Sequence, residues 1–199
     1  MLPAFAILAI IASPVVQDVR IIAGQFKGRR LSTPSWEGLR PTSDKLRETL
    51  FNVLSPRITS ARVVDGFAGT GAVGIEALSR GASHVLFIER DRRAASLIAS
   101  NLALCGVKQG YTIECGDVAL VLRRMPAGTE HDLILLDPPY DIDPDPVTQA
   151  LKAAADVLAA DGLIVLERAS RGDLDVPSTL RRVRDVASGD STLTILRRS

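Results

Sequence analysis

VVDGFAGTGAVG, residues 63–74, carries an apolar strand into a helix through a turn that is rich in glycine. Gly69, Gly71 and Gly74 fit the spacing G-x-G-x-x-G, in which glycine lets the main chain turn tightly and lets a ligand approach it. Dinucleotide-binding folds share this spacing, so it does not identify the ligand by itself. A strand that ends in such a turn and leads into a helix predicts the first unit of an open α/β sheet.

Apolar strands and helices alternate after this turn. The strands are nearly continuous apolar runs, such as Leu133-Ile134-Leu135-Leu136, and a helical segment follows each of them. Strands of this kind are buried on both faces, so we predict a mostly parallel sheet with helices on each side. We expect strands at 62–65, 84–89, 111–115, 133–137 and 163–167, and helices at 71–80, 91–105, 117–124 and 147–159. Strands at 180–186 and 192–196 predict a terminal antiparallel hairpin.

A different kind of sequence precedes the sheet. Residues 1–18 are almost wholly apolar, lack the basic start of a signal peptide and are too short to span a bilayer. We interpret them as an over-extended gene start, with Val19 as the true initiator. Beyond them we predict strands at 20–23 and 26–31 and a helix at 44–54 with Ser43 as its N-cap. The predicted divisions are an apolar extension (1–18), a basic β-hairpin and helix (19–60), and the α/β domain (61–199).

The composition is that of an ordinary globular protein. Of the 199 residues, 46% are apolar and 24% are charged. No apolar run reaches the length of about 18 residues that a membrane helix needs, which excludes a multi-spanning membrane protein. Cys105 and Cys115 are too few for a disulfide scaffold and lack the spacing of a zinc site. Structural or solvated roles are expected for the other candidate ligands: His84, His131, Asp141, Asp143 and Asp145.

Positive charge is concentrated near the N-terminus. Residues 20–62 hold nine Lys and Arg against three acidic residues, a net charge of +6, whereas the whole chain has a net charge of +1. Most of the basic residues are arginines, whose planar group suits phosphate and the edge of guanine. A basic segment beside an acidic middle indicates a nucleic-acid partner.

Three carboxylates lie at or just after the ends of predicted strands, at the edge where α/β proteins bind ligands. Asp65 ends the first strand. A carboxylate at this position would repel an anionic diphosphate, but it suits a ligand with an ammonium group and a sulfonium charge. Glu89 ends the second strand and can accept hydrogen bonds from both hydroxyls of a ribose. Asp117 follows the third strand and can either bond an adenine amino group or cap the next helix. Of these acids, Asp65 favours S-adenosylmethionine over a nicotinamide cofactor.

The fourth strand ends in Asp137-Pro138-Pro139-Tyr140, the most specific chemical signal in the sequence. Two prolines cannot continue a β-ladder, so they fix a rigid bend at the carboxyl edge of the sheet. Asp137 and the Pro138 carbonyl can accept hydrogen bonds from the exocyclic amine of a base and aim its nitrogen at a methyl group. Tyr140 can stack on a base that has been flipped out. This stretch resembles the (D/N)PP(Y/F) motif of amino-methyltransferases.

The wider pattern resembles the RsmD family of bacterial methyltransferases. Besides the glycine-rich turn and residues 137–140, the resemblance is carried by residues 20–31, 39–54 and 76–82. It implies a class I methyltransferase with a Rossmann-like sheet and an N-terminal β-hairpin and helix that bind RNA and cover the cofactor. It also implies methyl transfer from S-adenosylmethionine to N2 of a guanine in 16S ribosomal RNA. The final hairpin departs from the family pattern, because residues 184–192 lack the expected Tyr-Gly.

The predicted site collects these motifs. Catalysis is assigned to Asp137, Pro138, Pro139 and Tyr140. Cofactor contacts are assigned to Asp65, Phe67, Ala68, Gly69, Gly71, Glu89, Asp117 and Thr42. RNA contacts are assigned to Arg20, Lys27, Arg29, Arg30, Arg40, Lys45 and Arg47. We expect a cytoplasmic monomer that acts on 16S rRNA or on a small-subunit assembly particle, without a membrane or a metal.

Two other functions remain open at this point. A DNA methyltransferase acting on adenine N6 or cytosine N4 would use the same Asp137 motif, but the chain has no separate target-recognition domain. A Rossmann oxidoreductase or a non-catalytic binding module would bind NAD in place of S-adenosylmethionine. The sequence identifies neither the modified guanine nor the form in which the RNA is recognised.

Overall fold

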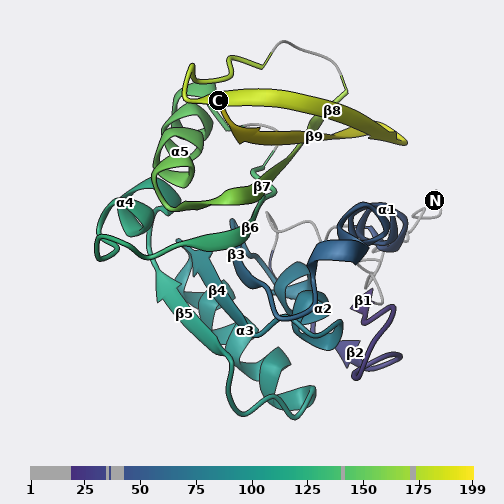
Figure 1. Cartoon of the computed structure of the whole chain (residues 1–199). Helices are drawn as coiled ribbons and strands as arrows, with labels where there is room; N and C mark the ends of the chain where they lie inside the picture. The colour runs from purple at the N-terminus through teal and green to yellow at the C-terminus, as the bar shows by residue number, and fades with distance from the viewer. Residues whose placement is uncertain (1–18, 35, 37–42, 140–141, 171–173) are drawn as a thin grey trace, which may run out of the picture.

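The computed structural model describes residues 19–34, 36, 43–139, 142–170 and 174–199. Its centre is a seven-stranded sheet with the strand order β5-β4-β3-β6-β7-β9-β8 (Figure 1). Neighbours from β5 to β7 pair in parallel, whereas β9 runs antiparallel to both β7 and β8. The predicted α/β class with a terminal antiparallel hairpin is confirmed. The strands are β3 (Arg62–Gly66), β4 (His84–Glu89), β5 (Tyr111–Cys115), β6 (His131–Leu136), β7 (Leu158–Ala169), β8 (Leu180–Ser188) and β9 (Ser191–Arg198).

Helices cover both faces of this sheet. Successive residues of a strand point to opposite faces, so Val63 packs in one hydrophobic cluster and Val64 in the other. The first cluster includes Ile75 of α2 and Ile98 of α3, and the second includes Leu122 of α4. The middle strands are therefore buried on both faces, as their continuous apolar runs predict. The helices are α2 (Ala72–Ser79), α3 (Arg92–Leu104), α4 (Val118–Arg123) and α5 (Pro144–Asp156).

Two boundaries around α5 differ from the predicted ones. α5 begins at Pro144, three residues earlier than predicted, because a proline at the first helical position lacks only an N–H that would be unpaired there. β7 begins at Leu158, inside the predicted helix, because Leu158 pairs with His131. A register shift follows, and the pairing resumes between Leu133 and Leu163.

The N-terminal arm, residues 19–34, forms a shorter hairpin than predicted. Between its two strands, the N–H groups of Ile22 and Ala23 donate to the Glu76 carboxylate at 2.7 and 2.9 Å. Main-chain pairing ends at Ile21, whose N–H donates to the Arg29 carbonyl at 2.9 Å, and the N–H groups that follow bind α2 instead. The two strands are β1 (Val19–Arg20) and β2 (Arg30–Leu31), which pair antiparallel.

The predicted helix at 44–54 is present. The Ser43 side chain accepts a hydrogen bond from the Leu46 N–H at 3.3 Å, so the predicted N-cap is confirmed. Phe51 and Leu54 are buried in the first cluster, which also contains Ile21 of the arm, so arm, helix and sheet share one core. The elements here are α1 (Asp44–Leu54) and the 3₁₀-helix η1 (Ser55–Arg57).

Within the ranges that the structure describes, no helix has both the length and the apolar character needed to cross a membrane. The predicted apolar extension, residues 1–18, lies outside those ranges. The division at residues 60 and 61 stays a prediction.

Candidate active site

The strand order places the candidate site at the carboxyl ends of β3 and β6. The chain runs from β3 outward to β5 and then returns to the other side of β3 with β6. Open α/β sheets bind ligands at such a switch point, because the loops after the two strands diverge there. Gly66, the last residue of β3, pairs with Ile88 of β4 and with Leu136 of β6. The glycine-rich turn and the Asp137 motif therefore leave the sheet side by side.

Packing explains why the turn is rich in glycine. A Cβ atom on Gly74 would lie 2.2 Å from the Phe87 ring and 2.9 Å from the Asp65 carboxylate, so only glycine lets α2 approach the sheet this closely. Gly71 caps α2 with a φ of 75°, a left-handed conformation that glycine adopts readily. Phe67 also has a positive φ, 63°, which stores strain at the turn, since it is not a glycine.

Glu89 joins this turn to the next strand. Its Oε2 accepts a hydrogen bond from the Gly69 N–H at 2.9 Å, and its Oε1 accepts one from the Asp91 N–H at 2.8 Å. Each carboxylate oxygen has a further lone pair, so the predicted bonds from ribose hydroxyls are compatible with these contacts. In dinucleotide-binding folds, main-chain N–H groups of this turn donate to the diphosphate. Here the Gly69 N–H donates to the Glu89 carboxylate instead.

Asp65 is buried beneath the turn, with 2% of its surface exposed. Its Oδ2 accepts a hydrogen bond from the Gly74 N–H at 2.8 Å. Burial raises the pKa of the Asp65 carboxyl to about 8, while the Gly74 bond lowers this pKa and the nearby Glu89 charge raises it. A positively charged ligand would favour the ionised carboxylate, so the group is suited to a cation and not to a phosphate.

Asp117 follows β5 at the same edge of the sheet. Its Oδ1 accepts a hydrogen bond from the Leu120 N–H at 3.0 Å, so it is the N-cap of α4. This is the structural alternative that the sequence left open. The residue is exposed, and its contact with an adenine stays a prediction.

The Asp137 motif begins where β6 ends. The Asp137 N–H donates to the Gly66 carbonyl at 3.4 Å, which attaches the start of the bend to the end of β3. Asp137 is half-buried, Pro138 is buried and Pro139 is exposed. Three predicted site residues lie outside the described part of the chain: Arg40, Thr42 and Tyr140.

The predicted RNA contacts divide by exposure. Arg47 needs a correction, because its side chain is 0% exposed. Its Nη2 donates to the Asp44 carboxylate at 2.6 Å and to the Arg20 carbonyl at 2.8 Å, so it holds α1 against the arm and does not face RNA. The other described candidates are exposed, and their contact with RNA stays a prediction: Arg20, Lys27, Arg29, Arg30 and Lys45.

Glu76 has a role that sequence reasoning missed. It is 0% exposed, yet its Oε1 forms an ion pair with Arg80 Nε at 2.7 Å and its Oε2 lies 3.8 Å from Arg47 Nη1. One turn later, the Ser79 hydroxyl accepts a hydrogen bond from the Phe26 N–H at 2.9 Å. Through Glu76 and Ser79, the second half of α2 holds the arm in place.

Further contacts connect the N-terminal region to the glycine-rich turn and to α3. Asn101, which is 0% exposed, donates to the Thr70 carbonyl at 2.9 Å and to the Ser32 carbonyl at 3.1 Å. The Arg93 guanidinium lies 4.9 Å from the centre of the Trp36 ring. Asn101 is a single Asn in a helix and Trp36 is a single Trp in a loop, and neither belongs to a sequence motif. The sequence therefore contains no signal for these contacts.

The described residues offer no metal centre. No three His, Cys, Asp or Glu side chains among them are placed to hold a metal ion. His131 is buried, and this burial lowers its pKa to about 4, so the ring is neutral at pH 7. Cys105 is buried as well.

Comparison with known proteins gives a consistent result. Residues 19–197 match the family model "Conserved hypothetical protein 95". The chain is 36% identical to "Ribosomal RNA small subunit methyltransferase D" of Haemophilus influenzae, over 86% of this chain and 90% of that one. The Escherichia coli K12 protein of the same name is 42% identical over 62% of this chain, and the match spans only 61% of the relative's own length.

A solved structure resembles the whole fold. The structure of yhhF from Escherichia coli superposes with a TM-score of 0.80 at 32% identity, covering 92% of this chain and 98% of that one. The similarity therefore extends beyond the central sheet.

Proposed function

We propose that this chain, which belongs to the family described as "Conserved hypothetical protein 95", transfers a methyl group from S-adenosylmethionine to N2 of a guanine in 16S ribosomal RNA. Membership of this family agrees with the resemblance to RsmD methyltransferases that the sequence indicated. The observation that carries the proposal is the bond between Asp137 and Gly66. This bond supports the proposal because the Asp137 motif, the proposed amine acceptor, leaves the sheet directly beside the glycine-rich turn, at the switch point of the sheet.

The residues at this edge fit S-adenosylmethionine by their chemistry. Three acids lie at or just beyond the carboxyl ends of neighbouring strands, and they suit hydroxyl and amine donors and positive charge: Asp65, Glu89 and Asp117. An anionic diphosphate would be repelled by these acids. It would also lack a hydrogen bond from the Gly69 N–H, because that group already donates to Glu89. When bound, the cofactor supplies an electrophilic methyl group on a positively charged sulfur. Glu89 would hold the ribose, and Asp65 would face the cationic end.

Asp137 and Pro138 perform the positioning that the reaction requires. The lone pair of an exocyclic base amine is delocalised into the ring, so the nitrogen is a weak nucleophile. The Asp137 carboxylate and the Pro138 carbonyl accept hydrogen bonds from this amine, hold it in place and raise its electron density. Positioning of this kind supplies about 7–11 kcal/mol of the barrier in favourable cases. No strong base is required, because the nitrogen becomes acidic once it is methylated.

The RNA assignment rests on the arm and on the relatives. Exposed basic side chains of the arm, such as Lys27 and Arg29, would hold phosphates while the guanine enters the site. Guanine N2 is on the Watson–Crick edge, so the target base must be unpaired or flipped. The relatives from Haemophilus influenzae and Escherichia coli are named as methyltransferases of small-subunit ribosomal RNA. We expect the enzyme to act in the cytoplasm, as a monomer, on 16S rRNA or an assembly particle.

The test is methyl transfer from labelled S-adenosylmethionine, with three substrates offered in parallel. These are naked 16S rRNA, small-subunit particles from a strain that lacks the gene, and duplex DNA. Mass spectrometry of the digested nucleosides should find N2-methylguanosine in RNA. Label on adenine N6 or cytosine N4 of the DNA, with none in RNA, would assign the site to DNA instead.

A further inference from the structure

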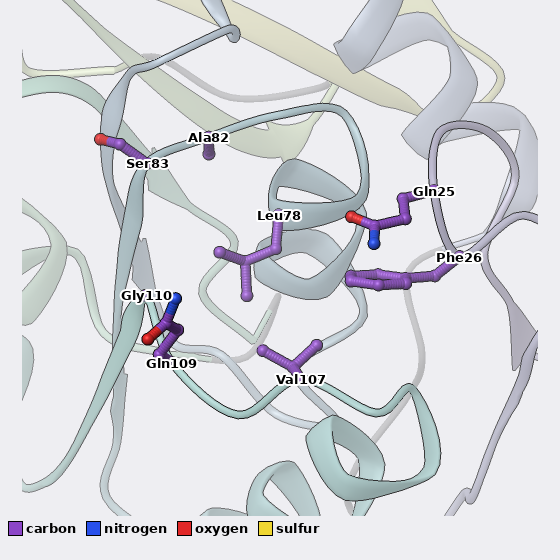
Figure 2. A pocket seen from close by; sticks show the side chains of 8 residues that line it. All are labelled: Gln25, Phe26, Leu78, Ala82, Ser83, Val107, Gln109 and Gly110. Atoms are coloured by element: carbon purple, nitrogen blue, oxygen red, sulfur yellow. The ribbon is translucent and has the colours of Figure 1, made fainter.

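A pocket of about 420 Å³ lies away from the candidate active site, next to the amino ends of β4 and β5 (Figure 2). Three separate segments line it. The arm contributes Gln25 and Phe26, the end of α2 and the loop after it contribute Leu78 and Ser83, and the loop before β5 contributes Val107 and Gln109. Open α/β sheets usually bind their ligands at the carboxyl ends of the strands, so this pocket lies on a different surface.

The arm side of the pocket is held firmly. The Gln25 N–H donates to the Ser79 carbonyl at 2.8 Å, and the Phe26 N–H donates to the Ser79 hydroxyl at 2.9 Å. Figure 2 shows that the side chains of Gln25 and Phe26 point toward Leu78. Because the main chain beneath them is fixed, a ligand would not have to order these side chains from a mobile loop.

The surroundings of the pocket are positively charged. The three segments that contain its lining residues, 20–36, 77–88 and 92–113, include no Asp and no Glu. The exposed cations nearest in sequence to the lining residues are Lys27, Arg29 and Lys108. Arg29 is also oriented, since its Nη1 donates to the Leu104 carbonyl at 3.1 Å and its guanidinium lies 5.8 Å from the Phe26 ring.

We propose that this pocket is a second RNA subsite, which holds one unpaired base of the substrate RNA while Lys27, Arg29 and Lys108 contact the neighbouring phosphates. The side-chain amides of Gln25 and Gln109 can each donate and accept, as recognition of a base edge requires. Phe26 offers an aromatic surface for stacking. The volume is within the range of about 300–1,000 Å³ that small-molecule sites occupy.

Distance allows one RNA to reach both sites. β4 has six residues, which places its two ends about 20 Å apart. The subsite rests on the proposed function. It adds a contact with a nucleotide of the RNA other than the one that is methylated. A protein that holds the RNA at two points fixes the direction in which the strand crosses the active site.

The test uses a double variant, Lys108→Ala with Gln109→Ala, in the full-length protein. Both side chains are exposed, and the change leaves the core intact. We expect the KM for 16S rRNA to rise about tenfold, the size of losing one base contact, with kcat and the cofactor Kd unchanged. The slope of log affinity against log salt should fall by about 1, because one phosphate contact is lost. Lys152→Ala, an equal charge change on α5 across the sheet, is the control and should alter neither value.

A second measurement separates this proposal from the methyltransferase assignment. RNA is cross-linked to the wild-type protein with ultraviolet light, and the modified peptides are identified by mass spectrometry. Nucleotides on peptides containing Phe26 or Gln109 support the subsite even if no methyl transfer is found. Methyl transfer with an unchanged KM in the double variant, or cross-links confined to other peptides, would overturn the subsite and leave the proposed function standing.

Discussion

The Glu89 carboxylate accepts a hydrogen bond from the Gly69 N–H at 2.9 Å, so the end of β4 holds the glycine-rich turn that follows β3. One side chain thus combines two tasks. It fixes the conformation of the turn, and it presents oxygen lone pairs at the edge where the cofactor would bind. The same contact uses a main-chain donor that a dinucleotide would need.

Glu89→Ala is expected to weaken binding of S-adenosylmethionine. The change removes the predicted acceptor for the ribose and leaves the Gly69 N–H without its partner, at a cost of about 2 kcal/mol or roughly 30-fold in Kd. Isothermal titration calorimetry measures this directly. Glu114→Ala, which removes an exposed acid of β5, is the control. Equal affinities for the two variants would show that Glu89 does not contact the cofactor.

Asp65 should make the ligand-free protein less stable as the pH rises. Its pKa is raised from 3.8 to about 8 by burial, so between these values the folded protein holds a proton that the unfolded chain has released. Stability therefore falls across this window, by up to about 1.4 kcal/mol per pH unit from this group. Urea unfolding at pH 5, 6, 7 and 8 should show a steeper decline in the wild type than in Asp65→Asn. Parallel curves for the two proteins would contradict the raised pKa.

Gly24 and Gly28 provide a matched pair in the arm. Both have a φ of +81°, but a Cβ on Gly24 would lie 1.9 Å from the Ser79 carbonyl oxygen, whereas a Cβ on Gly28 meets nothing within 4 Å. Gly28→Ala should cost about 1 kcal/mol of stability from backbone strain alone. Gly24→Ala should cost more and expose the arm to protease, because the arm must move off α2. If both variants unfold at the same urea concentration, the close approach to Ser79 is not present in solution.

Glu76→Gln should loosen the arm without disturbing the sheet. Glu76 accepts bonds from Ile22 and Ala23 and pairs with Arg80, so loss of its charge leaves the largely buried Arg80 without this carboxylate partner. We expect a loss of about 3 kcal/mol in the free energy of unfolding, typical of breaking a buried ion pair. Glu48→Gln, on the exposed side of α1, should change it by less than about 0.5 kcal/mol. Similar losses in the free energy of unfolding for the two variants would show that Glu76 does not hold the arm in place.

The sequence predicted the central sheet well because strands such as β4 and β6 are buried on both faces. Their apolar runs therefore show the strands without any knowledge of the partners. The ends of these strands located Glu89 and Asp137, since parallel strands place their carboxyl ends at one edge. Ser43 was found because the bond of an N-cap is local, spanning three residues.

Features that depend on distant partners could not be predicted in this way. The β1–β2 hairpin is short because Glu76, more than 50 residues away, binds the N–H groups of the turn. Arg47 is charged, like the exposed Lys45 and Glu48 near it, and its burial depends on its partners Asp44 and Arg20. The start of β7 depends on Leu158 meeting His131, a contact between two elements that helix propensity does not describe.

The most direct test of the account is the rate of methyl transfer to 16S rRNA in a single turnover with Asp137→Ala. With this variant, N2-methylguanosine should form at least about 100-fold more slowly than with the wild type, while the Kd for S-adenosylmethionine stays within about twofold. Asp161→Ala, which removes an exposed carboxylate of β7, should react at the wild-type rate. A wild-type rate in Asp137→Ala would contradict the account, because the amine would then be held and activated by another group.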